Sequence, residues 1–274
     1  MTRIALIQMV SSQQQHQSLE RASELIHSVP DDVEAIFLPE NFSALAAADP
    51  RQLGEAESRP DGPVQRFLAA TSRESGKWIF GGTVPHASRP DGTPVPDQRV
   101  RAASLVYTSA GELICRYDKI HMFDVDVSDA TANYRESTTF EPGEDLQVTD
   151  SPLGPIGLSV CYDIRFPELY RALALRGATS FTIPSAFTRV TGKAHFELLM
   201  RARAVENLCY TIAACQGGTH DSGRETWGHS MVVSPWGEVL AQAGEGEAVI
   251  CADIDLQEVE RRRSQMPVHR QRRL

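Results

Sequence analysis

Short apolar runs rich in β-branched residues recur along the whole chain, and they constrain its fold more than any other feature. Turn residues or stretches with helical spacing separate the runs, as is typical of strands joined by helices and hairpins. Several runs contain few polar residues, so we expect strands that are buried on both faces. The runs lie at 3–10, 34–39, 78–84, 103–108, 112–117, 156–160, 180–184, 211–215, 230–234 and 248–254.

The segments between these runs predict both helices and hairpins. Apolar residues have helical spacing at 15–28 and 194–208, and Pro63 fits the first turn of a further helix. The short links at 109–111 and 235–237 each place Gly in a turn, so each predicts a β-hairpin. Together, β-α units and hairpins predict a mixed sheet, or two sheets packed together, covered by helices.

The length and charge of the chain limit its organisation and its partners. It has 274 residues, of which 41% are hydrophobic, and shows no repeat or interdomain linker, so we expect one compact domain over 1–274. Residues 261–274 contain six Arg and no acidic residue, and we expect them to form a basic tail. The net charge is nevertheless −9. An acidic surface gains nothing from polyanions, so neither nucleic acid nor a membrane is expected as a partner.

The apolar segments, the cysteine spacing and the short motifs of the sequence predict the compartment and the cofactors. Residues 4–10 form the only apolar opening, which is too short for a signal peptide or a membrane span, so we expect a cytoplasmic protein. The five Cys are widely spaced, without a CxxC motif, as in proteins with reduced thiols. No spacing matches a zinc module and no glycine-rich nucleotide motif occurs, so we expect no metal and no cofactor.

Cys161 stands where an apolar run ends and a turn begins. The run 156–160 precedes it, and the residues from Tyr162 to Pro167 lead into a helix that starts near Glu168. A thiol on such a turn is accessible, lies beside backbone N–H groups that can bind an oxyanion, and has its pKa lowered by the helix N-terminus. A free Cys is as often a small core residue. The pattern therefore leaves a nucleophile and a core thiol equally open, and we expect the other four Cys in the core.

Glu40 and Lys119 also follow predicted strands. Glu40 comes directly after the run 34–39, at the strand end where α/β proteins place their sites, and Lys119 comes after the run 112–117. Residues of these types at strand ends are more often exposed to solvent. Neither would be assigned a role from the local pattern alone.

Four segments occur in an order that resembles a known family. With IALIQM near the start of the chain, they are similar to the carbon-nitrogen hydrolase, or nitrilase, superfamily over nearly the whole length. The resemblance implies an α/β fold, a four-layer-forming α-β-β-α sandwich with mixed sheets, and a homodimer or higher homo-oligomer. The segments are LPENF at 38–42, YDKIHMFD at 117–124, YRESTTFEPG at 134–143 and CYDIRFPELYR at 161–171.

The resemblance also implies a catalytic site. Glu40, Lys119 and Cys161 would form a Glu-Lys-Cys triad, with Glu136 as a second glutamate that holds Lys119. Cleavage of an amide needs a nucleophile, a proton shuttle and a stabilised oxyanion. Cys161 would attack, Glu40 would carry the proton, and Lys119 with the N–H of Tyr162 would bind the oxyanion.

Later segments resemble the Nit branch of this superfamily. The implied substrate is a small-molecule amide: deaminated glutathione, hydrolysed to 2-oxoglutarate and Cys-Gly through a Cys thioester. The alternatives are an ω-amidase acting on 2-oxoglutaramate, an N-carbamoyl amino acid hydrolase, and a noncatalytic binding protein of the same fold. Phe196 departs from the Trp that members often have. The segments are PSAFT at 184–188, TGKAHFELLMRARAVENLCY at 191–210 and GHSMVVSPWGE at 228–238.

A 2-oxo acid substrate brings a carboxylate into the site, and an acidic protein needs a local cation to bind it. Arg165 lies four residues after Cys161 and is the nearest candidate, with Phe187 as a wall and Thr188 as a hydroxyl donor. An ion pair between Arg165 and Glu168 that only supports the structure is an equally open alternative.

Overall fold

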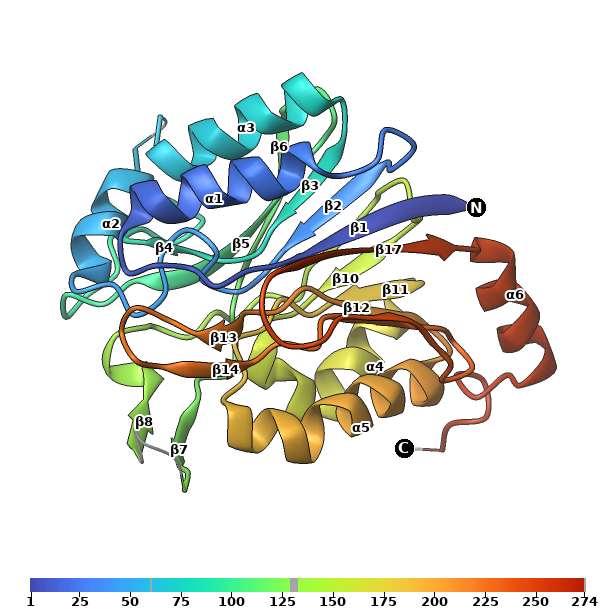
Figure 1. Ribbon diagram of the computed structural model, residues 1–274. Coiled ribbons are helices and arrows are strands. Elements are labelled where there is room, and N and C mark those ends of the chain that lie inside the picture. The colour runs from blue at the N-terminus through green and yellow to red at the C-terminus, as the bar shows by residue number, and fades with distance from the viewer. Residues whose placement is uncertain (60, 129–132, 274) are drawn as a thin grey trace.

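The computed structural model describes residues 1–59, 61–128 and 133–273. Two β-sheets stack face to face, and helices cover the outer face of each, which gives an α-β-β-α sandwich with mixed sheets (Figure 1). The predicted fold is confirmed. Across the described residues, no helix is both long and apolar enough to cross a membrane.

The first sheet has seven strands in the described part of the chain. β1, β2 and β3 are parallel, while β17 and β5 flank them in antiparallel pairs. The predicted hairpin around 109–111 is confirmed as the pair β5 and β6. The strands are β1 (Thr2–Gln8), β2 (Ala35–Leu38), β3 (Trp78–Gly81), β4 (Val84–His86), β5 (Arg101–Tyr107), β6 (Leu113–Asp118) and β17 (Ala248–Ile254).

The second sheet has six strands in the same described part. β10, β11 and β12 are parallel, and β9 and β15 pair with them antiparallel. The hairpin predicted around 235–237 is confirmed as β15 and β16. The strands are β9 (Val148–Thr149), β10 (Ile156–Leu158), β11 (Ser180–Thr182), β12 (Tyr210–Ala213), β15 (Met231–Val233) and β16 (Val239–Gln242).

Helices cover both outer faces, and two small hairpins lie at one end of the sandwich (Figure 1). α1 (Gln15–His27) and α3 (Pro63–Ser75) confirm the predicted helices on the first sheet, and α5 (Arg189–Asn207) confirms the longer one on the second. The remaining elements are α2 (Pro50–Glu57), α4 (Pro167–Leu175), α6 (Leu256–Gln265), the 3₁₀ helices η1 (Glu136–Thr138) and η2 (Cys161–Arg165), and the hairpins β7 (Asp124–Asp126) with β8 (Asn133–Arg135) and β13 (Gly217–Thr219) with β14 (Glu225–Trp227).

The alternation of side chains along β1 explains why its run is apolar throughout. Ile4 and Leu6 belong to the core between the two sheets, whereas Ala5 and Ile7 belong to the core under the helices. Burial of each such aliphatic side chain contributes roughly 1.5–3 kcal/mol. Because both faces are covered, any polar side chain in this strand needs an internal partner.

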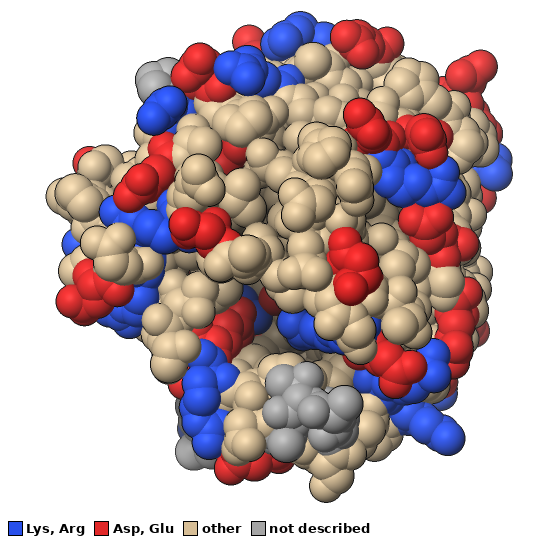
Figure 2. Space-filling model, turned by 60° about the vertical axis from the view of Figure 1, so that its left-hand side comes forward, with Lys and Arg blue, Asp and Glu red and all other residues tan. Residues whose placement is uncertain are grey.

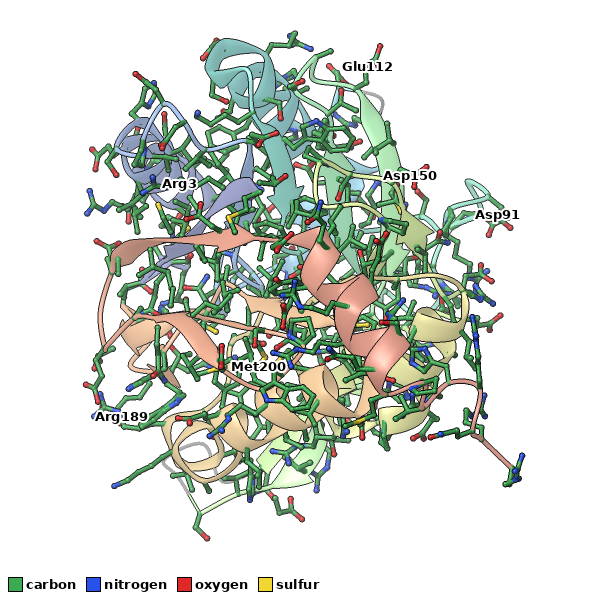
Figure 3. All side chains as sticks on the ribbon, turned by 90° about the vertical axis from the view of Figure 1, so that its right-hand side faces the viewer. Arg3, Asp91, Glu112, Asp150, Arg189 and Met200 are labelled. Atoms are coloured by element: carbon green, nitrogen blue, oxygen red, sulfur yellow. The ribbon has the colours of Figure 1, made fainter. Side chains whose placement is uncertain are left out.

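The basic segment 261–274, which we expected to form a tail, begins inside a helix. Arg261–Arg263 lie in α6, which crosses the end of the sandwich (Figure 3). Arg262 lies 4.1 Å over the ring of Trp236, and Arg263 donates a hydrogen bond to the carbonyl of Ala178 at 2.7 Å. Glu258 forms ion pairs with Arg261 and Arg262. The charges also stabilise the helix. Glu258 lies in its first turn and Arg262 and Arg263 lie in its last turn, and the helix dipole favours a negative charge at the start and positive charges at the end.

The charged side chains that Figure 3 labels lie at the outside of the molecule. The labelled charged examples are Arg3, Asp91, Glu112, Asp150 and Arg189.

The five cysteines are all free. Cys161, Cys209 and Cys215 are buried, while Cys115 and Cys251 are half-buried and pack against the edges of the two cores.

Candidate active site

Glu40, Lys119 and Cys161 each follow the end of a strand, and the fold brings these three ends to one cavity. Glu40 follows β2 and Lys119 follows β6 in the first sheet, whereas Cys161 follows β10 in the second. The cavity measures about 250 Å³, and Glu136 also lines it. The face that carries the β7–β8 hairpin is hollowed, with acidic and basic side chains around the hollow (Figure 2).

Lys119 lies between two carboxylates. Its Nζ is 2.8 Å from Oε1 of Glu40, and it lies 2.8 Å and 2.9 Å from the two carboxylate oxygens of Glu136. Its side chain is only 2% exposed. Burial by itself would lower the pKa of Lys119, but attraction by Glu136 and Glu40 raises that pKa well above its usual value. The side chain is therefore a fixed ammonium, not a proton donor at neutral pH.

The carboxylate of Glu40 is held on both sides. Oε1 accepts a hydrogen bond from Lys119, and Oε2 accepts one from the backbone N–H of Ala186 at 2.8 Å. The main-chain carbonyl of Glu40 accepts a further bond from Gln216 at 3.0 Å. Ala186 and Gln216 follow strands of the second sheet, so these segments hold Glu40, which follows a strand of the first sheet.

Cys161 has an unusual backbone conformation for a residue with a side chain. Its φ is +46°, in the left-handed region, and its N–H donates to the carbonyl of Pro184 at 3.0 Å. Such a conformation persists only where surrounding contacts impose it, and it is common at functional sites. The turn places Cys161 in the wall of the cavity that Glu40 and Lys119 also line.

The pKa of Cys161 differs in direction from our expectation. Burial raises the pKa of the thiol well above its usual value, the Glu40 carboxylate adds to the rise, and Lys119 opposes it. The expected lowering by a helix N-terminus is wrong because Cys161 begins a 3₁₀ helix of five residues and is buried beside a carboxylate. The resting group is a neutral thiol, so a nucleophilic role requires a base next to it.

Asp163 fixes the turn that carries Cys161. Its buried carboxylate accepts hydrogen bonds from the hydroxyl of Tyr117 at 2.7 Å, the N–H of Val160 at 2.8 Å and the N–H of His121 at 3.0 Å. Tyr117 and His121 lie on either side of Lys119 in the sequence. The same carboxylate therefore ties the chain around Lys119 to the chain around Cys161.

Glu136 contacts Lys119 from η1. It also accepts a hydrogen bond from the N–H of Phe123 at 2.6 Å. Burial raises the pKa of Glu136 from its usual value; Lys119 opposes the shift, and Glu40 adds to it. The arrangement keeps Lys119 in place from the side opposite to Glu40.

Tyr162, Phe187 and Thr188 line the cavity, as the sequence predicted for residues near the site. The N–H of Tyr162 lies at the start of η2, where backbone N–H groups have no partner within the helix. Thr188 caps α5, since its hydroxyl accepts from the N–H of Thr191 at 3.2 Å. Phe196 packs edge-on against Phe187 with ring centroids 5.2 Å apart, so it supports this wall.

Arg165 lies behind the cavity wall and is not among the described residues that line it. Its guanidinium carbon is 5.7 Å from the ring centroids of both Tyr162 and Phe187, and one nitrogen is 3.3 Å from Nδ1 of His195. The structure shows no ion pair between Arg165 and Glu168, both of which it describes, so the alternative of that pair is not supported.

The sequence analysis missed several residues of the cavity. Arg224 lies in the link of the β13–β14 hairpin, a setting in which an arginine is usually solvated, so no local signal marks it. Phe123 and Tyr134 lie inside segments used for the family resemblance but were given no role. The further lining residues are Asn41, Asn133, Arg135, Thr139, Phe140, Ala186 and Thr191.

A metal site is not evident in the part of the chain that the structure describes. There, no group of three or more His, Cys, Asp or Glu side chains could hold a metal ion.

The sequence is similar to enzymes with closely related names. It is 42% identical to a deaminated glutathione amidase of Yersinia enterocolitica over 266 residues, which cover 97% of this chain and 91% of the relative. It is 35% identical to the omega-amidase NIT2 of Xenopus tropicalis, with 99% of this chain and 95% of the relative covered.

Comparison with solved structures and with family patterns gives the same grouping. The fold matches Nit3 of Saccharomyces cerevisiae, described as a member of branch 10 of the nitrilase superfamily, with a TM-score of 0.85 and 32% identity over 100% of this chain and 97% of that one. The sequence pattern of the carbon-nitrogen hydrolase family matches residues 3–264. The chain therefore belongs to the carbon-nitrogen hydrolase family and is a hydrolase of carbon–nitrogen bonds other than peptide bonds.

Proposed function

We propose that this enzyme hydrolyses deaminated glutathione to 2-oxoglutarate and Cys-Gly, with Cys161 as nucleophile and Glu40, Lys119 and Glu136 as its partners. One observation carries the catalytic assignment. A buried ammonium contacts two carboxylates in a cavity that also contains a buried thiol. The choice of substrate is supported by the similarity to deaminated glutathione amidases, of which the one from Yersinia enterocolitica is 42% identical.

In the first half of the reaction, Cys161 attacks the carbonyl carbon of the scissile amide. Glu40 takes the thiol proton as the S–C bond forms, which overcomes the raised pKa of Cys161. The negative charge on the carbonyl oxygen is stabilised by the ammonium of Lys119 and the N–H of Tyr162. When this intermediate collapses, the C–N bond breaks, Glu40 protonates the departing amine, and a thioester remains.

In the second half, water cleaves the thioester. Glu40 takes a proton from the water as its oxygen attacks the same carbon, and Lys119 and Tyr162 again stabilise the oxyanion. Collapse breaks the C–S bond, and the proton on Glu40 returns to the sulfur of Cys161. Glu136 holds Lys119 from the opposite side, so the ammonium stays in place while Glu40 gains and loses its proton.

We also propose that the enzyme is cytoplasmic and forms a homodimer or higher homo-oligomer. Five free cysteines support a reducing compartment. The outer face of α5 exposes Val190, Leu198 and Val205, and the side chain of Leu198 is 68% exposed. An exposed apolar face of this kind supports association of copies.

A substrate panel tests the proposed function. We expect the highest kcat/KM for deaminated glutathione among that compound, 2-oxoglutaramate, glutamine and N-carbamoyl amino acids. If 2-oxoglutaramate is the best substrate, the enzyme is an ω-amidase, which the similarity to the Xenopus tropicalis omega-amidase supports as the second candidate. Absence of turnover on every amide would instead indicate a binding protein.

Substitution of Arg165 is expected to weaken binding of substrates that carry a 2-oxo acid. The guanidinium carbon of Arg165 lies 5.7 Å from the ring centroids of Tyr162 and Phe187, which line the cavity, so we assign it to the wall that a substrate carboxylate would meet. A lost charged hydrogen bond predicts a decrease of about 10- to 100-fold in kcat/KM for Arg165→Ala. Arg165→Lys should also lose affinity because an ammonium cannot form the bidentate pair.

The matched measurement uses an amide of the same length without the carboxylate. Its kcat/KM should change little in Arg165→Ala. An equal loss on both amides would assign Arg165 to support of the wall rather than to recognition of the substrate.

A further inference from the structure

One wall of the cavity is a row of three aromatic rings, with Arg224 lining the cavity at one end and Arg165 behind the wall at the other. The ring centroids of Tyr134 and Phe123 are 5.1 Å apart, and those of Phe123 and Tyr162 are also 5.1 Å apart. The guanidinium carbon of Arg224 lies 5.7 Å from the Tyr134 ring, and that of Arg165 lies 5.7 Å from the Tyr162 ring. The wall is therefore aromatic along its length and meets a cation that lines the cavity at the Arg224 end.

Arg224 lines the cavity and has unused hydrogen-bonding capacity. One terminal nitrogen donates to the carbonyl of Ala186 at 3.3 Å, while Nε is buried and has no partner among the described residues. None of the ion pairs within residues 1–59, 61–128 and 133–273 includes Arg224. Arg189, on the neighbouring helix, is by contrast paired with Glu225 and Glu245. A partly buried guanidinium without a carboxylate gains more from an incoming anion than a solvated one does.

The second arginine of the cavity is less suited to an anion. Arg135 donates to Asp126 at 2.8 Å and to the carbonyl of Tyr134 at 2.7 Å, and its side chain is 49% exposed. Its charge is already balanced and largely hydrated. Arg224 is therefore the cation that a ligand in this part of the cavity would meet.

We propose that Arg224 binds the terminal carboxylate of the leaving dipeptide and so selects amides with an anion at both ends. This inference rests on the proposed function. Deaminated glutathione has one carboxylate on the 2-oxo acid and a second on the glycine, with the scissile amide between them. Tyr162 follows Cys161 directly in the sequence, so we place the reacting carbon near the Tyr162 end of the wall. The glycine carboxylate is farther from that carbon than the 2-oxo acid carboxylate is, and the longer stretch of wall, past Phe123 and Tyr134, leads to Arg224.

The test compares two substrates that share the 2-oxoglutaryl group. Deaminated glutathione carries the dipeptide, whereas 2-oxoglutaramate releases only ammonia and has no second carboxylate for Arg224 to bind. In Arg224→Ala, the ratio of kcat/KM for deaminated glutathione to that for 2-oxoglutaramate should fall about 10- to 100-fold, chiefly through KM. Arg189→Ala removes the same charge beside the same hairpin and should leave the ratio unchanged.

A substrate change provides a second, independent arm. The analogue with glycinamide in place of glycine lacks the terminal carboxylate, so the wild-type enzyme should lose a similar factor on it. Arg224→Ala should then show no further loss on that analogue, since one partner of the pair is already absent. This arm applies even if the variant folds poorly, because the wild-type result alone can contradict the proposal.

The outcomes separate this inference from the proposed function. If the wild-type enzyme hydrolyses no 2-oxoglutaryl amide, the proposed function is wrong and the inference falls with it. If it hydrolyses both, and either Arg224→Ala leaves the ratio unchanged or the glycinamide analogue reacts as well as the acid, only the role of Arg224 is wrong.

Discussion

Cys161→Ala is expected to abolish amide hydrolysis while leaving the protein folded. The substitution removes the sulfur that forms the thioester, and loss of a covalent nucleophile typically lowers kcat on the order of 10⁴-fold or more. Alanine keeps the Cβ and all backbone contacts, including the bond from the N–H to Pro184. The measurement is kcat on deaminated glutathione, with the thermal midpoint of unfolding recorded for the same preparation.

Cys209→Ala is the matched control for this prediction. Cys209 is also a buried free thiol, but its sulfur contacts the carbonyls of Ala178 and Asn207 instead of the cavity. Burial raises its pKa to about 11, and the charged groups that act on it within the described residues are Arg263 and Arg171 rather than a carboxylate. The control should keep wild-type kcat. Retained activity in Cys161→Ala, or loss of kcat in the control alone, would contradict the assignment.

Alkylation distinguishes the thiols by their accessibility and reactivity toward a reagent. Iodoacetamide should modify Cys161 first, because this thiol lines the cavity and has Glu40 beside it. Cys215 is buried, and burial raises its pKa. Labelling of Cys209 or Cys215 at the same rate as Cys161 would count against the proposed nucleophile.

The layers of this fold were predictable because they depend on local patterns. The run at 3–10 contains apolar residues on both faces of a strand, and β1 indeed packs Ile4 and Ile7 into different cores. α6 was missed because its sequence is rich in arginine and buries only Val259 among its residues. Its stability comes from contacts with distant residues such as Trp236 and Ala178, which no local pattern contains.

The candidate site was predictable only in part, because it too depends on contacts between residues that are distant in the sequence. Glu40, Lys119 and Cys161 were named from a family resemblance, and their local patterns alone assigned no role. Their approach depends on the stacking of two sheets, since Glu40 and Cys161 follow strands of different sheets. Arg224 was missed because a turn arginine carries no periodic signal, and its place in the cavity depends on where the β13–β14 hairpin folds.

Glu40→Gln and Lys119→Met are each expected to lower kcat by several orders of magnitude, on the order of 10³- to 10⁴-fold. Gln keeps the size of Glu40, and its single amide oxygen can accept a hydrogen bond from Lys119 or from the N–H of Ala186 but not from both, and it cannot accept the thiol proton. Met removes the charge that stabilises the oxyanion and leaves the carboxylates of Glu40 and Glu136 facing each other. Wild-type thermal stability of Glu40→Gln would show that the loss is chemical.

The double variant tests whether Glu40 and Lys119 act as one unit with Cys161. Proton transfer by Glu40 produces the oxyanion that Lys119 stabilises, so removal of either residue already blocks the same step. We therefore expect the double variant to be little slower than the slower single variant, since members of a catalytic unit are not additive. If the two losses instead multiply, Glu40 and Lys119 contribute independently. A kcat within tenfold of wild type for Glu40→Gln would remove Glu40 from the mechanism, because Glu136, the other carboxylate among the described residues that line the cavity, is already held by Lys119 and the N–H of Phe123.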